Sequence, residues 1–305
     1  MIRPDFDRIT ADRLPEPEVL LSLCQWMGLT PEFTNLLMEA LPVLQADPAT
    51  VERFPRDCRH YRTCPDYEKF TPTEAEARSF YYAFVHFASL PALCDQWRAR
   101  QIPEALIQAT AGEFERWLHR YREQHGVWGF DLINWSSVYA QGRLVPLGRL
   151  GFEIISFPAF CHLPKKTGTT PLLQAGDPVI SVHIPAKGAL TPADCDHAFA
   201  LAREFFPRYF PEHNYKAFIC VSWMMDRQLA LYLPPESNLI HFQNRFQPAV
   251  VDNANDDSFW SFIFNIPKRP AHLAEMPRDT RLRRVLIEHI EQGNAWQIAA
   301  GYIPR

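Results

Sequence analysis

The apolar positions of the first 125 residues recur at the spacing of a helix. Over 31–45 they fall three or four residues apart, as on one helical face, at Phe33, Leu36, Leu37 and Leu41. Over 71–100, Thr73 is a candidate N-cap, acidic residues follow in the first turn, and aromatic residues then recur in steps of three and four. The pattern predicts a helical N-terminal domain over 1–125.

From Gly126 the pattern changes to short apolar runs that are rich in β-branched and aromatic residues and broken by glycines. We therefore place a domain boundary near residue 125 and expect an antiparallel meander over 126–160, with Gln141-Gly142 as a hairpin turn. Three later apolar runs are predicted to be buried strands, at 178–185, 217–225 and 258–267.

Helices are predicted between and after these runs. Thr191 precedes Pro192 and two early aspartates, which favours a capped helix that continues to Tyr209. A short helix is expected over 226–234, helical or irregular structure over 237–248, and a last helix that ends at Gly293. The fold class is therefore α/β (α+β): a helical N-terminal domain packed on a mixed, mostly antiparallel sheet over 126–305, flanked by helices.

Composition excludes several classes of function. The formal net charge of −4 leaves no basic excess for a nucleic-acid partner. Neither a signal peptide nor an apolar run of about 18 residues is present, so we expect no membrane partner and a cytoplasmic location. The seven cysteines are odd in number and irregular in spacing, which predicts buried thiols. Cys58, His60 and Cys64 lack the spacing of a four-ligand zinc site, so no metal is expected.

Four short motifs follow one another in the second half: LGRLGFE at 147–153, VHIP and GALT within 182–191, CVSWMM at 220–225 and SNLIHFQNRF at 237–246. Together they resemble the GNAT-like C-terminal domain of a bacterial acyltransferase family, in which that domain follows a helical N-terminal acyltransferase domain. The resemblance implies an N-acyltransferase that uses an acyl-CoA as co-substrate and an amine of a small molecule or peptide as acceptor.

Glu153 and His183 are the candidate proton-transfer residues within these motifs. A carboxylate in an apolar strand is costly to bury unless it is paired, used or neutral, and an imidazole titrates near neutral pH. If their strands pair, as adjacent strands of a GNAT-like sheet would, the two side chains become neighbours. The alternatives are an ion pair of Glu153 with Arg149 and a core histidine.

Tyr232 is a further catalytic candidate. The resemblance places it in the region where many GNAT enzymes carry a tyrosine general acid. The alternative is a core tyrosine on an amphipathic helix.

The resemblance places the acyl-CoA site in the turn that follows the strand at 178–185. Such a turn, where it contains glycine and enters a helix, offers backbone N–H groups and the helix dipole to phosphates. The candidate residues are Ile184, Lys187, Gly188, Ala189 and Thr191. The stretch 185–190 departs from the Arg/Gln-x-x-Gly-x-Gly/Ala loop usual in the GNAT fold, so a plain strand-to-helix turn remains the alternative.

Ser222 and Asn238 complete the candidate donor site. Ser222 and Trp223 are expected to end the second buried strand, where the resemblance to a GNAT-like sheet implies that the central strands diverge and the thioester lies; the alternative for Ser222 is a capping serine. Asn238 follows Ser237, and the two are alternatively a helix cap. Cys220 lies in an apolar run that predicts an inert thiol.

Two other functions remain open. The incomplete phosphate loop is compatible with a binding or regulatory protein on a degenerate GNAT scaffold, since a fold does not fix a function. A hydrolase with a serine or cysteine nucleophile is the second, although the chain lacks the Gly-x-Ser-x-Gly elbow of the commonest such fold.

Overall fold

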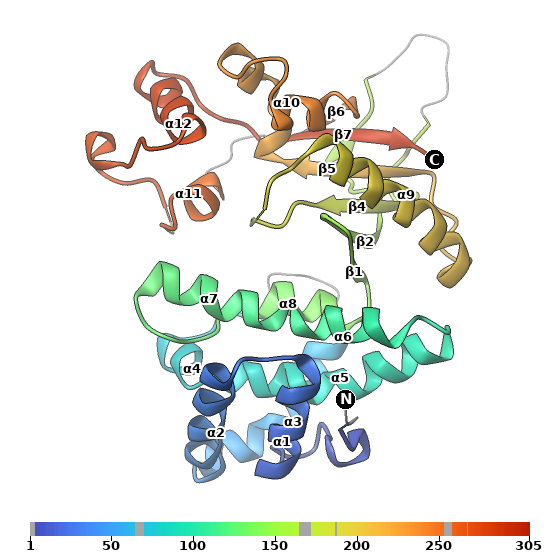
Figure 1. Ribbon diagram of the computed structural model, residues 1–305, viewed down its shortest axis with the longest axis vertical. Coiled ribbons are helices and arrows are strands. Elements are labelled where there is room, and N and C mark those ends of the chain that lie inside the picture. Colours follow the sequence, from blue (N-terminus) through green and yellow to red (C-terminus); the bar gives the residue numbers. More distant parts are fainter. Residues whose placement is uncertain (1–3, 65–69, 165–171, 187, 253–257, 267) are drawn as a thin grey trace. The chain divides into compact units, whose positions relative to one another are not determined.

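The computed structural model describes residues 4–64, 70–164, 172–186, 188–252, 258–266 and 268–305 (Figure 1). The chain forms two compact units, Met1–Val145 and Pro146–Arg305. This division lies later than the boundary expected near residue 125, because the segment after Gly126 continues the helical unit. We call the two parts the N-terminal unit and the C-terminal unit.

The N-terminal unit is helical, as its apolar spacing predicted. A 3-10 turn (η1, Phe6–Arg8) precedes the helices α1 (Pro17–Met27), α2 (Pro31–Gln45), α3 (Pro48–Thr63), α4 (Glu74–Arg78), α5 (Tyr81–Ala99), α6 (Glu104–Gly112), α7 (Phe114–His125) and α8 (Ile133–Ala140). Thr73 caps α4 in a capping box with Glu76, which satisfies two backbone donors at the helix start. Most side chains of α5 are buried, so this helix lies at the centre of the unit (Figure 1).

The prediction of strands directly after Gly126 was wrong, because 133–140 forms the helix α8. This segment is buried on nearly every side, and periodicity does not distinguish a short buried helix from a buried strand. Gly142, with φ of 69°, ends α8 and is not a hairpin turn. The hairpin turn lies at Gly148-Arg149, between β1 (Leu144–Leu147) and β2 (Leu150–Ser156).

The C-terminal unit is built on one mixed sheet whose strand order is β1-β2-β4-β5-β7-β6-β3. The remaining strands are β3 (Cys161–His162), β4 (Pro178–His183), β5 (Ala217–Ser222), β6 (Gln247–Val251) and β7 (Ala299–Pro304). β4 and β5 pair in parallel, whereas the pairs β2–β4, β5–β7, β6–β7 and β3–β6 are antiparallel. The predicted α/β class, with its mixed and mostly antiparallel sheet, is confirmed.

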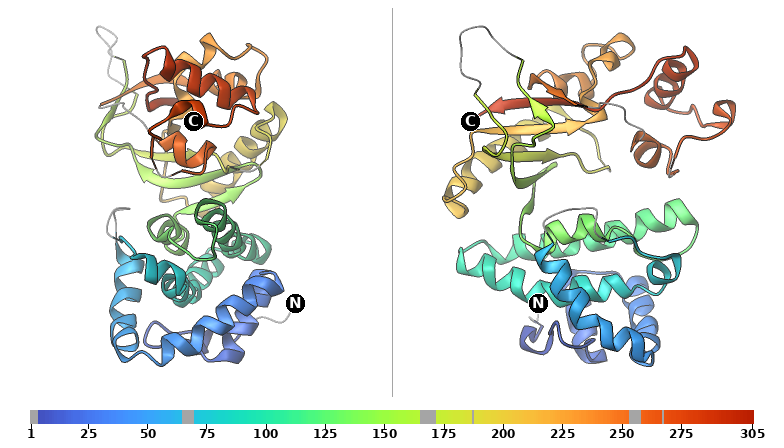
Figure 2. Two further views of the ribbon diagram at one scale, coloured as in Figure 1. Left: turned by 90° about the vertical axis from the view of Figure 1, so that its left-hand side faces the viewer. Right: turned by 180° about the vertical axis from the view of Figure 1, so that it is seen from behind.

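The helix α9 (Pro192–Tyr209) connects the two parallel strands and covers one face of the sheet (Figures 1 and 2). Its Phe199 packs edge-on against Phe152 of β2 and Phe218 of β5. Thr191 caps the helix, as predicted, by accepting a hydrogen bond from the N–H of Asp194. This packing fixes the start of α9 beside the end of β4.

The segment 258–267 was predicted as a third buried strand, and this prediction was wrong. The helix α11 (Ser258–Ile263) forms there, and Pro267 lies outside the described residues. Phe259 and Trp260 are buried and Phe264 follows one turn later, whereas Phe262 is exposed. That is helical spacing, since a strand would bury alternate residues.

The other elements of this unit surround the sheet. They are the helices α10 (Asn238–Gln243) and α12 (Arg281–Glu291) and the 3-10 turns η2 (Trp223–Met225), η3 (Arg227–Leu231) and η4 (Leu273–Glu275). Trp223, directly after β5, joins α11 and α12 in one apolar cluster. Among the residues that the structure describes, no helix combines the length and the apolar character needed to cross a bilayer.

Candidate active site

Glu153 and His183 lie side by side on β2 and β4. The antiparallel register pairs Gly151 with His183 and Glu153 with Ser181. Glu153 and His183 are therefore diagonal neighbours on one face of the sheet. His183 Nε2 lies 2.9 Å from Glu153 Oε2, and this contact confirms the predicted adjacency.

The two side chains differ in their exposure to solvent. Glu153 is 1% exposed, whereas the side chain of His183 is 30% exposed. An ionised carboxylate only accepts hydrogen bonds, so His183 Nε2–H donates to Glu153 and Nδ1 becomes the basic nitrogen of the ring. In this arrangement His183 can meet a substrate, and Glu153 orients the imidazole.

The ladder between the parallel strands β4 and β5 ends before their carboxyl ends, and we call the place beyond it the opening of the sheet. Their pairing joins Ile180 to Phe218 and Ser181 to Ile219, and it ends before His183 and Ser222, the last residues of the two strands. In open sheets with parallel strands, ligands bind outside the carboxyl ends. His183 therefore lies beside the opening of the sheet.

The turn 184–191 leaves this opening and enters α9. Gly188 has a φ of 97°, a conformation that glycine adopts without strain. Ile184 is half-buried, Gly188 and Ala189 are exposed, and Thr191 caps α9. Lys187 lies outside the described residues. The predicted phosphate-binding residues that the structure describes thus lie together at the start of a helix.

Sequence reasoning missed the part that Arg149 plays in this turn. Its Nη2 donates to the carbonyls of Pro185 at 2.9 Å and Gly188 at 2.7 Å, and its Nε donates to that of Ala189 at 2.9 Å. The guanidinium, considered from sequence only as a possible partner of Glu153, therefore bonds to the turn. The position of Arg149 after Gly148 in a tight hairpin was the available signal.

Ser222 and Asn238 lie at helix starts. Ser222 Oγ accepts a hydrogen bond of 3.1 Å from the N–H of Met224, so the capping alternative describes its present contact. Asn238 is the exposed first residue of α10, which Ser237 caps. Burial raises the pKa of Cys220 to about 12, as expected of an inert thiol.

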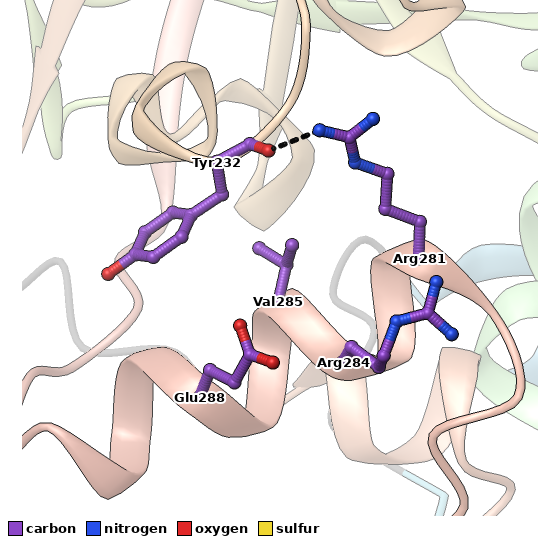
Figure 3. Close-up of a pocket in the computed structure, with 5 residues that line it drawn as sticks. All are labelled: Tyr232, Arg281, Arg284, Val285 and Glu288. Carbon is purple, nitrogen blue, oxygen red and sulfur yellow. Dashed lines mark hydrogen bonds between the residues drawn. The ribbon is translucent and has the colours of Figure 1, made fainter.

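Tyr232 lies against α12. Its hydroxyl is 2.9 Å from His289 Nδ1 and 3.1 Å from Gln292 Oε1, and its carbonyl accepts a hydrogen bond from Arg281. The ring borders a cavity of about 330 Å³ that Arg281, Arg284, Val285 and Glu288 also line (Figure 3). The structure therefore groups Tyr232 with α12, whereas Glu153 and His183 belong to β2 and β4. Within the described ranges, no group of three His, Cys, Asp or Glu side chains could hold a metal ion.

Two family models together match most of the chain. The model of the N-acyltransferase N-terminal domain matches residues 19–142, and the model of the GNAT-like C-terminal domain matches residues 144–303. Their junction lies next to the division of the structure after Val145.

Solved acyltransferase structures resemble the chain over nearly its whole length. An acyltransferase in complex with decanoyl-CoA and teicoplanin has a TM-score of 0.81 at 25% identity, over 98% of this chain and 93% of that one. A complex with decanoyl-CoA has a TM-score of 0.78 at 26% identity, over 96% and 89%. A complex with CoA and 10C-teicoplanin has a TM-score of 0.80 at 25% identity, over 98% and 93%. No curated protein matches the chain.

Proposed function

Since the chain belongs to the acyltransferase family in which an N-acyltransferase N-terminal domain precedes a GNAT-like C-terminal domain, we propose that it transfers an acyl group from an acyl-CoA to an amine. The family predicted from the four motifs is thereby confirmed. The observation that carries the proposed reaction is the contact of 2.9 Å between His183 and the buried Glu153 at the opening between β4 and β5.

The donor site combines the opening with the turn 184–191. The acyl group and pantetheine enter where β4 and β5 separate, and the pyrophosphate binds the backbone N–H groups of Gly188 and Ala189 and the start of α9. Ile184 borders the pantetheine. Thr191 supports the phosphate site by holding the first turn of α9 through its cap. Acyltransferases of the same fold bind decanoyl-CoA and CoA, which supports an acyl-CoA donor here.

Two further residues are assigned to pantetheine. Ser222, at the end of β5, has a hydroxyl proton that can be donated while its oxygen still accepts from Met224. Asn238 presents an exposed carboxamide at the start of α10. Both side chains offer hydrogen bonds to the amides of pantetheine.

His183 acts as the general base. Its Nδ1 takes a proton from the amine while the amine nitrogen bonds to the thioester carbonyl carbon, and the carbon–sulfur bond then breaks. The imidazolium, stabilised by Glu153, returns the proton to the CoA thiolate. An acid role for Tyr232 stays a prediction, since its hydroxyl is engaged with His289 and Gln292.

The acceptor is proposed to be an amine of a small molecule or peptide. Two of the similar acyltransferases are in complex with teicoplanin or 10C-teicoplanin. This supports an acceptor of modest size, and teicoplanin is the first acceptor to supply in an assay.

The test measures donor binding first and transfer second. Decanoyl-CoA at 100 times its dissociation constant should stabilise the native chain by about 2.7 kcal/mol, which raises its melting temperature. With teicoplanin added, mass spectrometry should detect an acceptor heavier by one decanoyl group, with release of free CoA.

The departure of 185–190 from the usual phosphate loop favours one other function, a binding or regulatory protein on the same scaffold. Absence of a melting shift with decanoyl-CoA, CoA and acetyl-CoA at millimolar concentration would favour that alternative and refute the proposed reaction.

A further inference from the structure

We propose that Arg149 is a positioning residue of the donor site, which holds the carbonyls of Pro185, Gly188 and Ala189 so that the N–H groups of Gly188 and Ala189 face the phosphates of the acyl-CoA. The inference rests on the proposed function, and it assigns to Arg149 a part in donor recognition. Arg149 touches the turn and acts on the donor through it.

The first support is the set of carbonyls that the guanidinium binds. Three carbonyls within five residues, those of Pro185, Gly188 and Ala189, accept hydrogen bonds of 2.7 to 2.9 Å from this one side chain. Carbonyl oxygens carry partial negative charge and would repel a pyrophosphate. With these oxygens bound to Arg149, the N–H groups of the turn are left to bind an anion.

The second support is the backbone at Gly188. Its φ of 97° lies in the left-handed region, a backbone conformation that occurs in anion-binding nests. A Cβ on Gly188 would lie 3.5 Å from Arg149 Nε, so the guanidinium packs directly against this residue. The arginine and the glycine together define the conformation of the turn.

The third support is the place of Arg149 in the chain. Gly148, with φ of 61°, makes the tight turn that brings Arg149 to the start of β2. The same strand carries Glu153, whose carboxylate contacts His183. The hairpin and β2 therefore carry both the carboxylate that contacts His183 and the guanidinium that holds the turn.

The test separates phosphate recognition from general stability. Calorimetry is carried out with decanoyl-CoA and with decanoyl-pantetheine, which has the same thioester arm but lacks the pyrophosphate and the nucleotide. We expect Arg149→Met to raise the Kd for decanoyl-CoA by about tenfold or more, and to change the Kd for decanoyl-pantetheine by less than about twofold. Arg149→Lys, which restores the charge without the planar fork, should behave like Arg149→Met.

Arg283→Met is the matched control. Arg283 also holds a backbone carbonyl, with bonds of 2.9 and 3.2 Å, but that carbonyl belongs to Ile263, the last residue of α11. It should leave the ratio of the two Kd values unchanged.

Three results would overturn the inference. An equal rise in both Kd values would make Arg149 a merely structural residue, and full recovery of decanoyl-CoA affinity in Arg149→Lys would assign the effect to charge alone. Wild-type protein that binds decanoyl-CoA no more tightly than decanoyl-pantetheine would refute a phosphate site in this turn. Wild-type protein that binds neither donor would refute the proposed function itself.

Discussion

Each unit of the molecule places a histidine in a hydrogen-bonded network, and the two networks differ in partner and access. In the N-terminal unit, His86 is 1% exposed and its Nδ1 lies 2.8 Å from the hydroxyl of Tyr61. In the C-terminal unit, the side chain of His183 is 30% exposed and bonds to the carboxylate of Glu153. The imidazole of His86 contacts a phenol in the core, whereas that of His183 contacts a carboxylate and is accessible to a substrate.

The network around His86 has a definite direction. Ser136 donates to the carbonyl of Ile133 at 3.0 Å, and Tyr61 donates to Ser136 at 2.7 Å. His86 Nδ1–H therefore donates to Tyr61, and its Nε2 is left unprotonated. Nε2 has no hydrogen-bond partner in the part of the chain that the structure describes. Burial lowers the pKa of His86 to about 3, so this ring stays neutral and serves the fold.

The difference teaches how a catalytic histidine is distinguished from a core histidine. The two lie in similar apolar runs, YYAFVHFASL and VISVHIP, so local sequence does not separate them. A buried carboxylate partner and partial exposure of the side chain do separate them, because together they orient the ring and admit a substrate.

The largest expected effect is on catalysis. His183→Ala should lower the rate of acyl transfer by about a hundredfold to ten-thousandfold, the usual contribution of a general base. Glu153→Gln should lower it less, because the imidazole remains in place. The rates are measured with decanoyl-CoA and teicoplanin as CoA release. A wild-type kcat in His183→Ala would show that His183 is not the general base.

The next effect is the acid dependence of stability. The pKa of His86 is lowered in the folded chain. The contribution of this neutral ring to the free energy of unfolding is therefore complete above the pKa of the unfolded chain, about 6.5, and is lost as the pH falls toward 3. From pH 7 to pH 5 the loss is about 2 kcal/mol. Urea unfolding of wild type and His86→Gln at both pH values measures it. The two proteins should differ in slope with pH, and parallel slopes would show that His86 does not carry this dependence.

The smallest expected effect is that of Tyr61→Phe on stability. Tyr61→Phe removes the acceptor of His86 Nδ1–H and the donor to Ser136, which should cost about 1–2 kcal/mol of unfolding free energy. The kcat of acyl transfer should stay unchanged, since the network serves the fold alone. Denaturation midpoints and kcat are measured on the same preparation. A lowered kcat in the folded variant would link this network to catalysis.

The strands and helix that carry the site were predictable because their signals are local. Continuous apolar runs predicted β4 and β5, and Thr191 with Pro192 predicted the start of α9. The contact of Glu153 with His183 followed from the pairing of adjacent strands.

Other parts depend on distant contacts. β7 contains Ala299, Ala300 and Gly301, which have little strand preference, and it forms a strand because β5 and β6 pair with it on either side. Arg149 meets a turn some forty residues away. No spacing along the chain encodes such an approach.

The short parallel ladder between β4 and β5 has a consequence for how a donor would enter. Pairing at Ile180–Phe218 and Ser181–Ile219 joins the two halves of the sheet, and this ladder ends before His183 and Ser222. A thioester arm bound there as proposed would insert without breaking a ladder bond. The donor site would be preorganised, and the free energy of binding would go to contacts with the ligand instead of to rearrangement of the protein.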